Sequence, residues 1–213
     1  AVYGQGLTPA EMKWIVNYQL ARGITLFCAA TLASSVSGPY MANERPVQTP
    51  HSPVWQCLGA FHDYTARLSY LLSLGEPLVK TALYMPVRDV WSNTGHSLKV
   101  MEDYDALALA LEEKKIDFDV IDDDALETAV INDGCLCVGK VCYKTVLAPQ
   151  CRHMTPAAAR KLSEFSEAGG RAAADVKQVR SPVIFEPAQA RVSLTARRLA
   201  NGTLYFIANE DVK

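Results

Sequence analysis

The residues best suited to chemistry in this chain are thiols and an imidazole beyond its middle: Cys135, Cys137, Cys142, Cys151 and His153. A Cys-x-Cys pair on a strand points both side chains to one face, and the chain has no C-x-x-C pair, so we expect no metal site. We interpret the cysteines as reduced thiols that behave as small apolar core residues. Disulfides would require an oxidising compartment, for which the sequence offers no evidence.

Two of these thiols are candidates for a catalytic nucleophile. Cys142 lies inside an expected strand and Cys151 follows one, but neither has the glycines of a nucleophile elbow. The base would be His96 or His153, and no spacing rule places either histidine beside a thiol. The chain also lacks GxGxxG, phosphate-loop and HExxH motifs. We therefore expect no catalytic residue here, with a cysteine hydrolase or an amidotransferase as the alternative.

A long irregular stretch, residues 31–53, carries several prolines and polar side chains. Such a loop is usually functional or a linker, and a loop after the carboxyl end of a parallel strand is where barrels contact substrate. The candidate substrate-binding residues are Asn43, Glu44, His51 and, at the start of the next helix, Trp55. A solvated connector is the alternative, and it is favoured for the chain taken alone.

Two further polar stretches follow expected strands. Residues 88–96 form an expected loop at the carboxyl edge of the first strand, where open α/β sheets hold ligands. Three consecutive acids, Asp122, Asp123 and Asp124, follow the next strand. They could hold a hard cation, but they also suit the N-cap and first turn of a helix, which is the interpretation we favour.

The elements that must position these residues alternate as in an α/β domain. The expected strands are 80–87, 118–121, 145–148 and 171–174, and the expected helices are 54–74, 103–115, 124–129 and one opened by Thr155-Pro156 and ended by Gly169-Gly170. A helix at 8–22 and a buried strand at 24–29 precede them. Hairpins are expected at 135–143, with Gly139-Lys140 as its turn, and at 190–209, with Asn201-Gly202.

Composition limits the classes of function. The chain has 213 residues, a formal net charge of -2 and 49% hydrophobic residues, which is enough for one good core. The charge gives no reason to expect nucleic acid, and no apolar run suits a membrane span. No signal peptide is visible, so with reduced cysteines a cytoplasmic location is favoured. We expect no cofactor and no metal.

An ordered set of motifs suggests a family. These are Pro53-Val54-Trp55, the run from Tyr64 to Gly75-Glu76-Pro77, Phe118-Asp119-Val120-Ile121, Asp133-Gly134 through Tyr143-Lys144 to Pro149, and Tyr205-Phe206-Ile207. Together they resemble segments of large bacterial glycoside hydrolases of the α-L-rhamnosidase type, family 106 and its relatives. The resemblance covers nearly the whole chain.

The resemblance implies a division into three regions. Residues 1–52 would be the last αβ unit and loop of a (β/α)8 barrel, 53–178 a flavodoxin-like three-layer domain akin to class I glutamine amidotransferases, and 179–213 the opening hairpin of a β-sandwich. In that family this domain is a scaffold and the catalytic acids lie upstream. The implied function is thus a non-catalytic accessory region of a multidomain glycoside hydrolase.

The resemblance also implies partners. These would be the remaining domains of the parent enzyme or a homo-oligomer partner, with the parent's carbohydrate as substrate. A pure protein-interaction domain is a further alternative, because apolar faces of residues 9–28 would seek a partner chain.

Overall fold

The computed structural model describes residues 6–29, 48–92, 95–177, 179–187 and 191–211. The chain divides between Gly75 and Glu76 into two compact units. This boundary differs from those of the three regions expected at 1–52, 53–178 and 179–213. Their assignment to parts of a larger enzyme therefore stays a prediction.

The first unit is built on two helices, α1 (Pro9–Leu20) and α2 (Trp55–Ser73). The expected start of α1 is confirmed, because Thr8 accepts a hydrogen bond from the backbone N–H of Glu11 and the Glu11 carboxylate accepts one from that of Thr8. The hydroxyl of Tyr64 donates to Oδ1 of Asn17 at 2.6 Å and so joins the two helices.

The predicted buried strand at 24–29 is wrong. These residues carry no regular structure, Leu26 is 90% exposed and Ile24 is 47% exposed. A buried parallel strand needs a strand on each side to satisfy its backbone groups, and no described residue of the first unit is in a strand. Apolar composition alone was therefore a misleading signal.

The second unit contains the expected parallel sheet. Its strands are β2 (Thr81–Tyr84), β3 (Phe118–Ile121), β7 (Thr145–Leu147) and β8 (Arg171–Ala173), in the order β3-β2-β7-β8. All neighbours run parallel, which confirms the α/β class. The helices are α3 (Val87–Trp91), α4 (Gly95–Glu113), α5 (Asp123–Thr128) and α6 (Pro156–Glu167).

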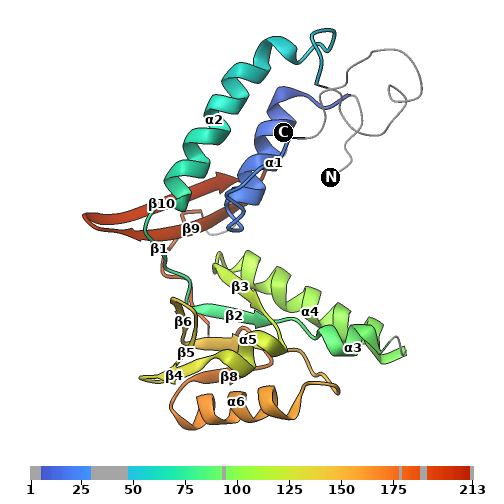
Figure 1. Ribbon diagram of the computed structural model, residues 1–213, viewed down its shortest axis with the longest axis vertical. Coiled ribbons are helices and arrows are strands. Elements are labelled where there is room, and N and C mark those ends of the chain that lie inside the picture. Colours follow the sequence, from blue (N-terminus) through green and yellow to red (C-terminus); the bar gives the residue numbers. More distant parts are fainter. Residues whose placement is uncertain (1–5, 30–47, 93–94, 178, 188–190, 212–213) are drawn as a thin grey trace. The chain divides into compact units, whose positions relative to one another are not determined.

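Apolar side chains cover both faces of this sheet, because successive strand residues point to opposite sides. One face, with Tyr84 and Val146, packs on α5 and α6, and Phe165 of α6 is fully buried there. The other face, with Leu83 and Leu147, packs on α4. Figure 1 shows α4 and α6 on opposite sides of the strands.

The region after β2 is more helical than expected. Residues 88–96 were predicted as a loop and the next helix was predicted at 103–115, but α3 forms at once and α4 begins at Gly95. The hydroxyl of Ser97 donates to the backbone carbonyl of Asp89 at 2.6 Å, which ties α4 to α3. Such a tertiary contact has no counterpart in local sequence periodicity.

The residues between α5 and β7 form a separate, three-stranded antiparallel sheet. It consists of β4 (Val130–Asn132), β5 (Cys135–Val138) and β6 (Val141–Tyr143). The predicted β5–β6 hairpin is confirmed, whereas β4 was not foreseen. Asp133 and Gly134 between β4 and β5 both have positive φ, 47° and 68°, as a type I′ turn requires.

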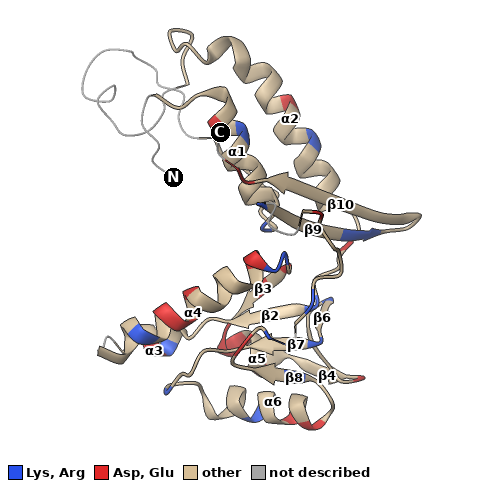
Figure 2. Cartoon of the chain, turned by 180° about the vertical axis from the view of Figure 1, so that it is seen from behind, with Lys and Arg blue, Asp and Glu red and all other residues tan. Residues whose placement is uncertain are grey.

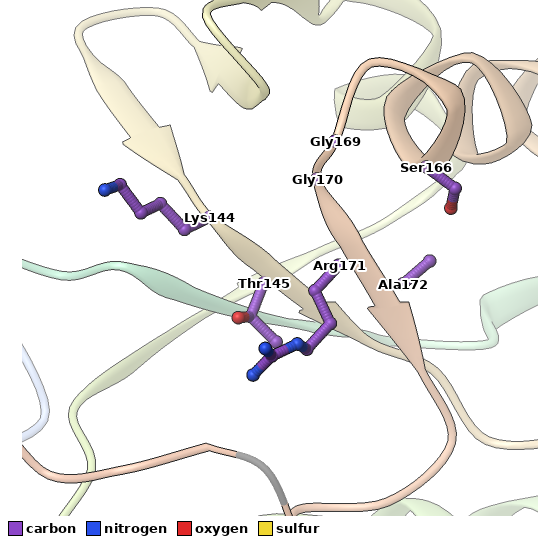
Figure 3. A pocket seen from close by; sticks show the side chains of 7 residues that line it. All are labelled: Lys144, Thr145, Ser166, Gly169, Gly170, Arg171 and Ala172. Atoms are coloured by element: carbon purple, nitrogen blue, oxygen red, sulfur yellow. The ribbon is translucent and has the colours of Figure 1, made fainter.

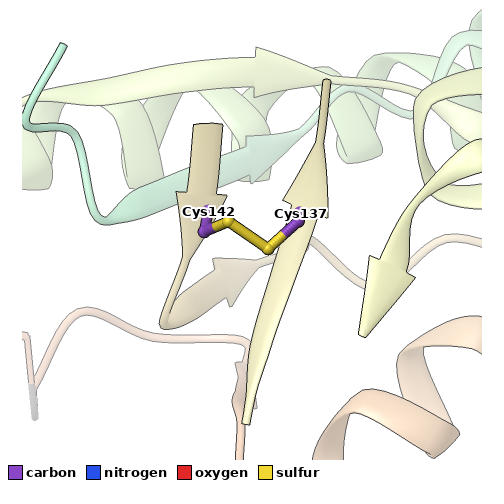
Figure 4. The surroundings of a disulfide bond; sticks show 2 residues. All are labelled: Cys137 and Cys142. Carbon is purple, nitrogen blue, oxygen red and sulfur yellow. A yellow bond between two sulfur atoms is a disulfide. The ribbon is translucent and has the colours of Figure 1, made fainter. Parts of the chain in front are cut away.

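Two cysteines of this hairpin form a disulfide, which corrects the expectation of reduced thiols for Cys137 and Cys142 but not for the free cysteines Cys28, Cys57, Cys135 and Cys151. Leu136 and Tyr143 are buried in the core, so Cys137 and Cys142 lie on the other face at directly paired positions. Their Cα atoms are 4.0 Å apart and their sulfur atoms are bonded (Figure 4). The disulfide removes the reduced-cysteine argument for a cytoplasmic location.

The end of the chain forms the expected hairpin, β9 (Val192–Leu199) and β10 (Gly202–Asn209). The short strand β1 (Glu76–Pro77) pairs with β9 and completes an antiparallel sheet in the order β1-β9-β10. In the described part of the chain, no helix combines the length and the apolar character that a membrane span needs.

Candidate functional site

The candidate site lies at the carboxyl edge of the parallel sheet, where strands β2, β3 and β7 end. Open α/β sheets hold their ligands at this edge. Three segments meet here: α3 after β2, the start of α5 after β3, and residues 148–155 between β7 and α6. Two carboxylates, those of Asp89 and Asp123, connect the segments.

Asp89 is 1% exposed and fastens the segment after β7. Its carboxylate accepts hydrogen bonds from the backbone N–H of Arg152, at 3.1 and 3.2 Å, and from that of His153 at 3.1 Å. Nδ1 of the His153 ring lies 3.1 Å from Oδ1 of Asp89. The buried carboxylate thus has its oxygens satisfied by one short stretch of chain.

These contacts determine the charge of Asp89. Burial raises the pKa of this carboxyl, but the hydrogen bonds from the His153 ring and from the backbone N–H of Arg152 and His153 outweigh burial. The net pKa is below its ordinary value. Asp89 is therefore ionised at neutral pH, and its negative charge is bound by the loop.

Asp123, 4% exposed, fastens the same segment from the other side. Its Oδ1 accepts the backbone N–H of Thr155 at 2.9 Å, and its Oδ2 accepts the hydroxyl of Tyr84 at 3.1 Å. Nε of Arg88 lies 3.5 Å from Oδ2. Burial, and then the Asp123 carboxylate, raise the pKa of Tyr84, so its hydroxyl stays protonated and keeps donating.

Two histidines border Asp89. His153 has a side chain that is 47% exposed, so a carboxylate-oriented imidazole reaches solvent here. Nε2 of His96, in the first turn of α4, lies 3.8 Å from Oδ1 of Asp89, too far for a hydrogen bond. This buried nitrogen has no hydrogen-bond partner among the described residues.

Cys151 is the thiol nearest this network in sequence, and it is partly exposed. Burial, and then the negative charge of Asp89, raise the pKa of its thiol. No hydrogen bond joins the thiol to a histidine within the described ranges. A nucleophilic cysteine needs the opposite, a lowered pKa beside a cation or a base.

The arrangement supports a structural role more directly than a catalytic one. Asp89 and His153 form a carboxylate–imidazole pair of the kind that orients a general base, but among the described residues no thiol or hydroxyl is hydrogen-bonded to the His153 ring. Within the part of the chain that the structure describes, no group of three or more His, Cys, Asp or Glu side chains could hold a metal ion. The two carboxylates connect the three segments by hydrogen bonds.

The predicted substrate-binding residues lie elsewhere in the fold. His51 is exposed before α2, and Trp55, the first residue of α2, is 41% exposed; both belong to the first unit. Asn43 and Glu44 lie outside the described residues. The role of all four in binding stays a prediction.

Sequence reasoning missed Asp89 and assigned Asp123 too simply. The capping prediction is confirmed for Asp122, whose side chain accepts the backbone N–H of Ala125 at 3.0 Å. Asp123 instead turns inward to Tyr84 and Thr155. The available signal was position, because both acids closely follow strands whose carboxyl ends share one edge.

A pocket lies at the opposite, amino edge of the sheet, between β7 and β8 (Figure 3). It has a volume of about 520 Å³ and is lined by Lys144, Thr145, Ser166, Gly169, Gly170, Arg171 and Ala172. None of the residues considered from the sequence as nucleophiles, bases or substrate contacts lines it.

The fold resembles that of a known protein. No protein-family model matches the chain, and no curated protein matches it. A solved structure, described as the structure of rhamnosidase from Novosphingobium sp. PP1Y, aligns with 98% of this chain at a TM-score of 0.60 and 16% sequence identity. The chain spans 25% of the length of that protein. At this identity, the match shows a shared fold.

Proposed function

We propose that this chain is a non-catalytic scaffold region of a larger glycoside hydrolase resembling α-L-rhamnosidases. The observation that carries the proposal is the shared fold, which extends over 98% of this chain and over 25% of a rhamnosidase. A match of this extent supports a chain that corresponds to one part of a longer enzyme. The ordered sequence motifs that resemble the same type of enzyme support it independently.

The carboxyl edge of the sheet supports a scaffold role. A ligand site at this edge needs polar groups that are available to a ligand. Here the carboxylates of Asp89 and Asp123 are 1% and 4% exposed and bind the chain's own loop. The edge is thus stabilised as a rigid junction.

The strand order supports the finer assignment of a flavodoxin-like domain. Along the sheet, the strands follow one another as second, first, third and fourth in chain order. This is the order of the first four strands in the flavodoxin-like sheet. Helices on both faces agree with it.

Exposed apolar residues of the first unit support a partner. Leu26 is 90% exposed, Ile24 47% and Tyr70 65%. We propose that the remaining domains of the parent enzyme pack against these exposed apolar residues. Exposure of His51 and Trp55 suits the proposed contacts with the parent's carbohydrate, to which Asn43 and Glu44 would add.

The proposal is tested by assaying the chain with an aryl α-L-rhamnoside. We expect release of the aryl alcohol at the rate of a blank protein, because the two acids that the described residues bring together, Asp89 and Asp123, are buried and bound to the chain's own backbone. Release above the blank that increases with protein concentration, and persists after repurification, would show that the chain is itself an enzyme.

A second candidate function is a cysteine hydrolase or amidotransferase that uses Cys151. The Asp89–His153 pair favours it, while the raised thiol pKa opposes it. Cys142, the other thiol considered, is bonded to Cys137. Intact-mass measurement after native iodoacetamide treatment separates the cases, with exposed Cys57 as the reference for an ordinary thiol. We expect Cys151 to react more slowly than Cys57, and faster reaction that disappears in Cys151→Ser would establish the second function.

A further inference from the structure

We propose that the outer edge of strand β10 binds the same strand of a second copy of this chain, in antiparallel pairing. β10 (Gly202–Asn209) stands at the end of the order β1-β9-β10, so among the described residues one of its sides has no neighbouring strand. Such a side presents backbone N–H and C=O groups that a further strand can pair with. The direction of these groups, the absence of charge and the order of the side chains each favour a second copy.

The backbone groups that face outwards belong to every second residue of β10, because hydrogen bonds in an antiparallel pair recur at alternate residue pairs. The carbonyl of Ala196 in β9 accepts the N–H of Leu78 at 2.9 Å, on the side of β1. Tyr205 is paired with Ala196, so the N–H and C=O groups of Tyr205 point away from β9. Those of Thr203 and Ile207 point the same way. Within the described part of the chain, the backbone of these three residues forms no hydrogen bond outside the sheet.

The β10 edge lacks the features that usually keep sheet edges apart, namely charges, prolines and short length. The other edge strands of the three described sheets each have one of them. β1 contains Pro77, β3 contains Asp119, β8 begins with Arg171, and β4 and β6 have three residues each. β10 has eight residues without a charge or a proline, and Figure 2 shows it in tan along its length. Two copies can therefore pair without bringing like charges together.

The order of the side chains in β10 is symmetric about Tyr205. A two-fold pairing centred there places Tyr205 opposite Tyr205 of the second copy. Thr203 then lies opposite Ile207, which are both β-branched, and Leu204 lies opposite Phe206, which are both large and apolar. Cross-strand pairs of these kinds stabilise a sheet. A second copy supplies this matching order by necessity, so it is the partner that the edge fits best.

The pairing would cover apolar side chains that are exposed in one copy. Tyr205 is 54% exposed and Ile207 is 53% exposed, and both lie on the same face because they are two residues apart in a strand. One pair of such strands is about 27 Å long and forms about six backbone hydrogen bonds, which makes it smaller than a standard interface. We therefore expect a dimer that dissociates on dilution.

The test is sedimentation equilibrium of the whole chain over about two decades of concentration. The free thiols are alkylated first, so that disulfides between copies cannot form. We expect a reversible equilibrium between monomer and dimer. A chain that stays monomeric throughout would overturn the proposal and leave the β10 edge to a strand of another protein, and growth beyond the dimer would contradict the two-fold pairing.

Charged variants at the centre of the pairing make the test specific. Tyr205→Lys places two lysines directly opposite each other and removes the aromatic pair, so it should weaken the dimer at least about tenfold. Tyr205→Glu should do the same. A mixture of the two variants should dimerise again, because opposite charges then face each other, and this also shows that both variants are folded.

The matched control is Tyr70→Lys, the same change at a 65% exposed tyrosine of α2. It should dimerise like the parent chain. The proposal is wrong if Tyr205→Lys dimerises as well as the control, if Tyr70→Lys dissociates the dimer, or if the mixture stays monomeric. It does not depend on the proposed scaffold function.

Discussion

The two edges of one parallel sheet are built in opposite ways. At the carboxyl edge, Asp89 and Asp123 are buried and hydrogen-bonded to the loop after β7. At the amino edge, Lys144 and Arg171 are exposed and line a pocket of about 520 Å³. The edge that usually holds ligands is closed by the chain's own groups, while the other edge is open and basic.

This contrast shows that fold topology does not by itself locate a site. The same strand ends that could present acids to a ligand can instead satisfy them internally. Which happens depends on whether a neighbouring loop supplies backbone N–H groups at the correct distance. Substitutions at each edge can show whether the carboxyl edge is structural and whether the amino edge is free of that role.

The largest effect is expected from Asp89→Ala. It removes the 1% exposed carboxylate that accepts the backbone N–H groups of Arg152 and His153, so the free energy of unfolding should fall by about 3 kcal/mol, the upper range for hydrogen bonds to a charged group. Urea denaturation at pH 7 measures it. Asp124→Ala, exposed in α5, is the control and should change stability by less than about 0.5 kcal/mol. If Asp89→Ala lowered the free energy of unfolding by a similarly small amount, the Asp89 hydrogen bonds would not stabilise the carboxyl edge.

An intermediate effect with a defined pH dependence is expected from Asp117→Asn. Burial, opposed by the hydrogen bond from Thr195, raises the pKa of this carboxyl from 3.8 to about 6. An acid whose pKa is raised by folding destabilises the native state as pH rises from about 4 to 6, because the folded chain holds the proton more tightly.

At pH 7 the Asn variant should therefore be about 2 kcal/mol more stable than the parent chain, and near pH 3.5 the two should be equal. Thermal or urea unfolding across this range measures the difference. Asp89 has the opposite shift, so its contribution disappears only as pH falls below about 4. A stability difference that is constant from pH 3.5 to 7 would contradict the assignment to Asp117.

The smallest effect is expected at the amino edge. Lys144 and Arg171 have exposed side chains, so Lys144→Gln and Arg171→Gln should each change the free energy of unfolding by less than about 0.5 kcal/mol. The measurement is urea denaturation at pH 7. Losses comparable to that of Asp89→Ala would mean that this edge is also structural, and the contrast between the edges would disappear.

Much of the fold was predictable because local signals agree with it. Thr155 and Pro156 mark the start of α6, and the Thr155 hydroxyl accepts the N–H of Ala158 at 3.1 Å as expected. The parallel strands β2, β3 and β7 were found as short apolar runs. The stretch at 24–29 has the same composition and is not a strand, because pairing requires neighbours that sequence composition does not report.

The candidate site was harder to predict. Asp89 stood in a stretch expected to be a loop, and its partners Arg152 and His153 lie more than sixty residues further along the chain. The contacts of Asp89 are long-range, so periodicity could not show them. Cys137 and Cys142 were expected to be reduced, although the predicted two-residue turn Gly139-Lys140 already places them directly opposite each other.

By itself the sequence determined the alternation of strands and helices, the helix starts at Thr8 and Thr155, and the two hairpins, because these depend on contacts within a few residues. Only the tertiary structure decided which acids are buried and which edge of the sheet is open. Those outcomes require segments distant in the chain to meet, and the free energy of such meetings is set by burial and hydrogen bonding between them.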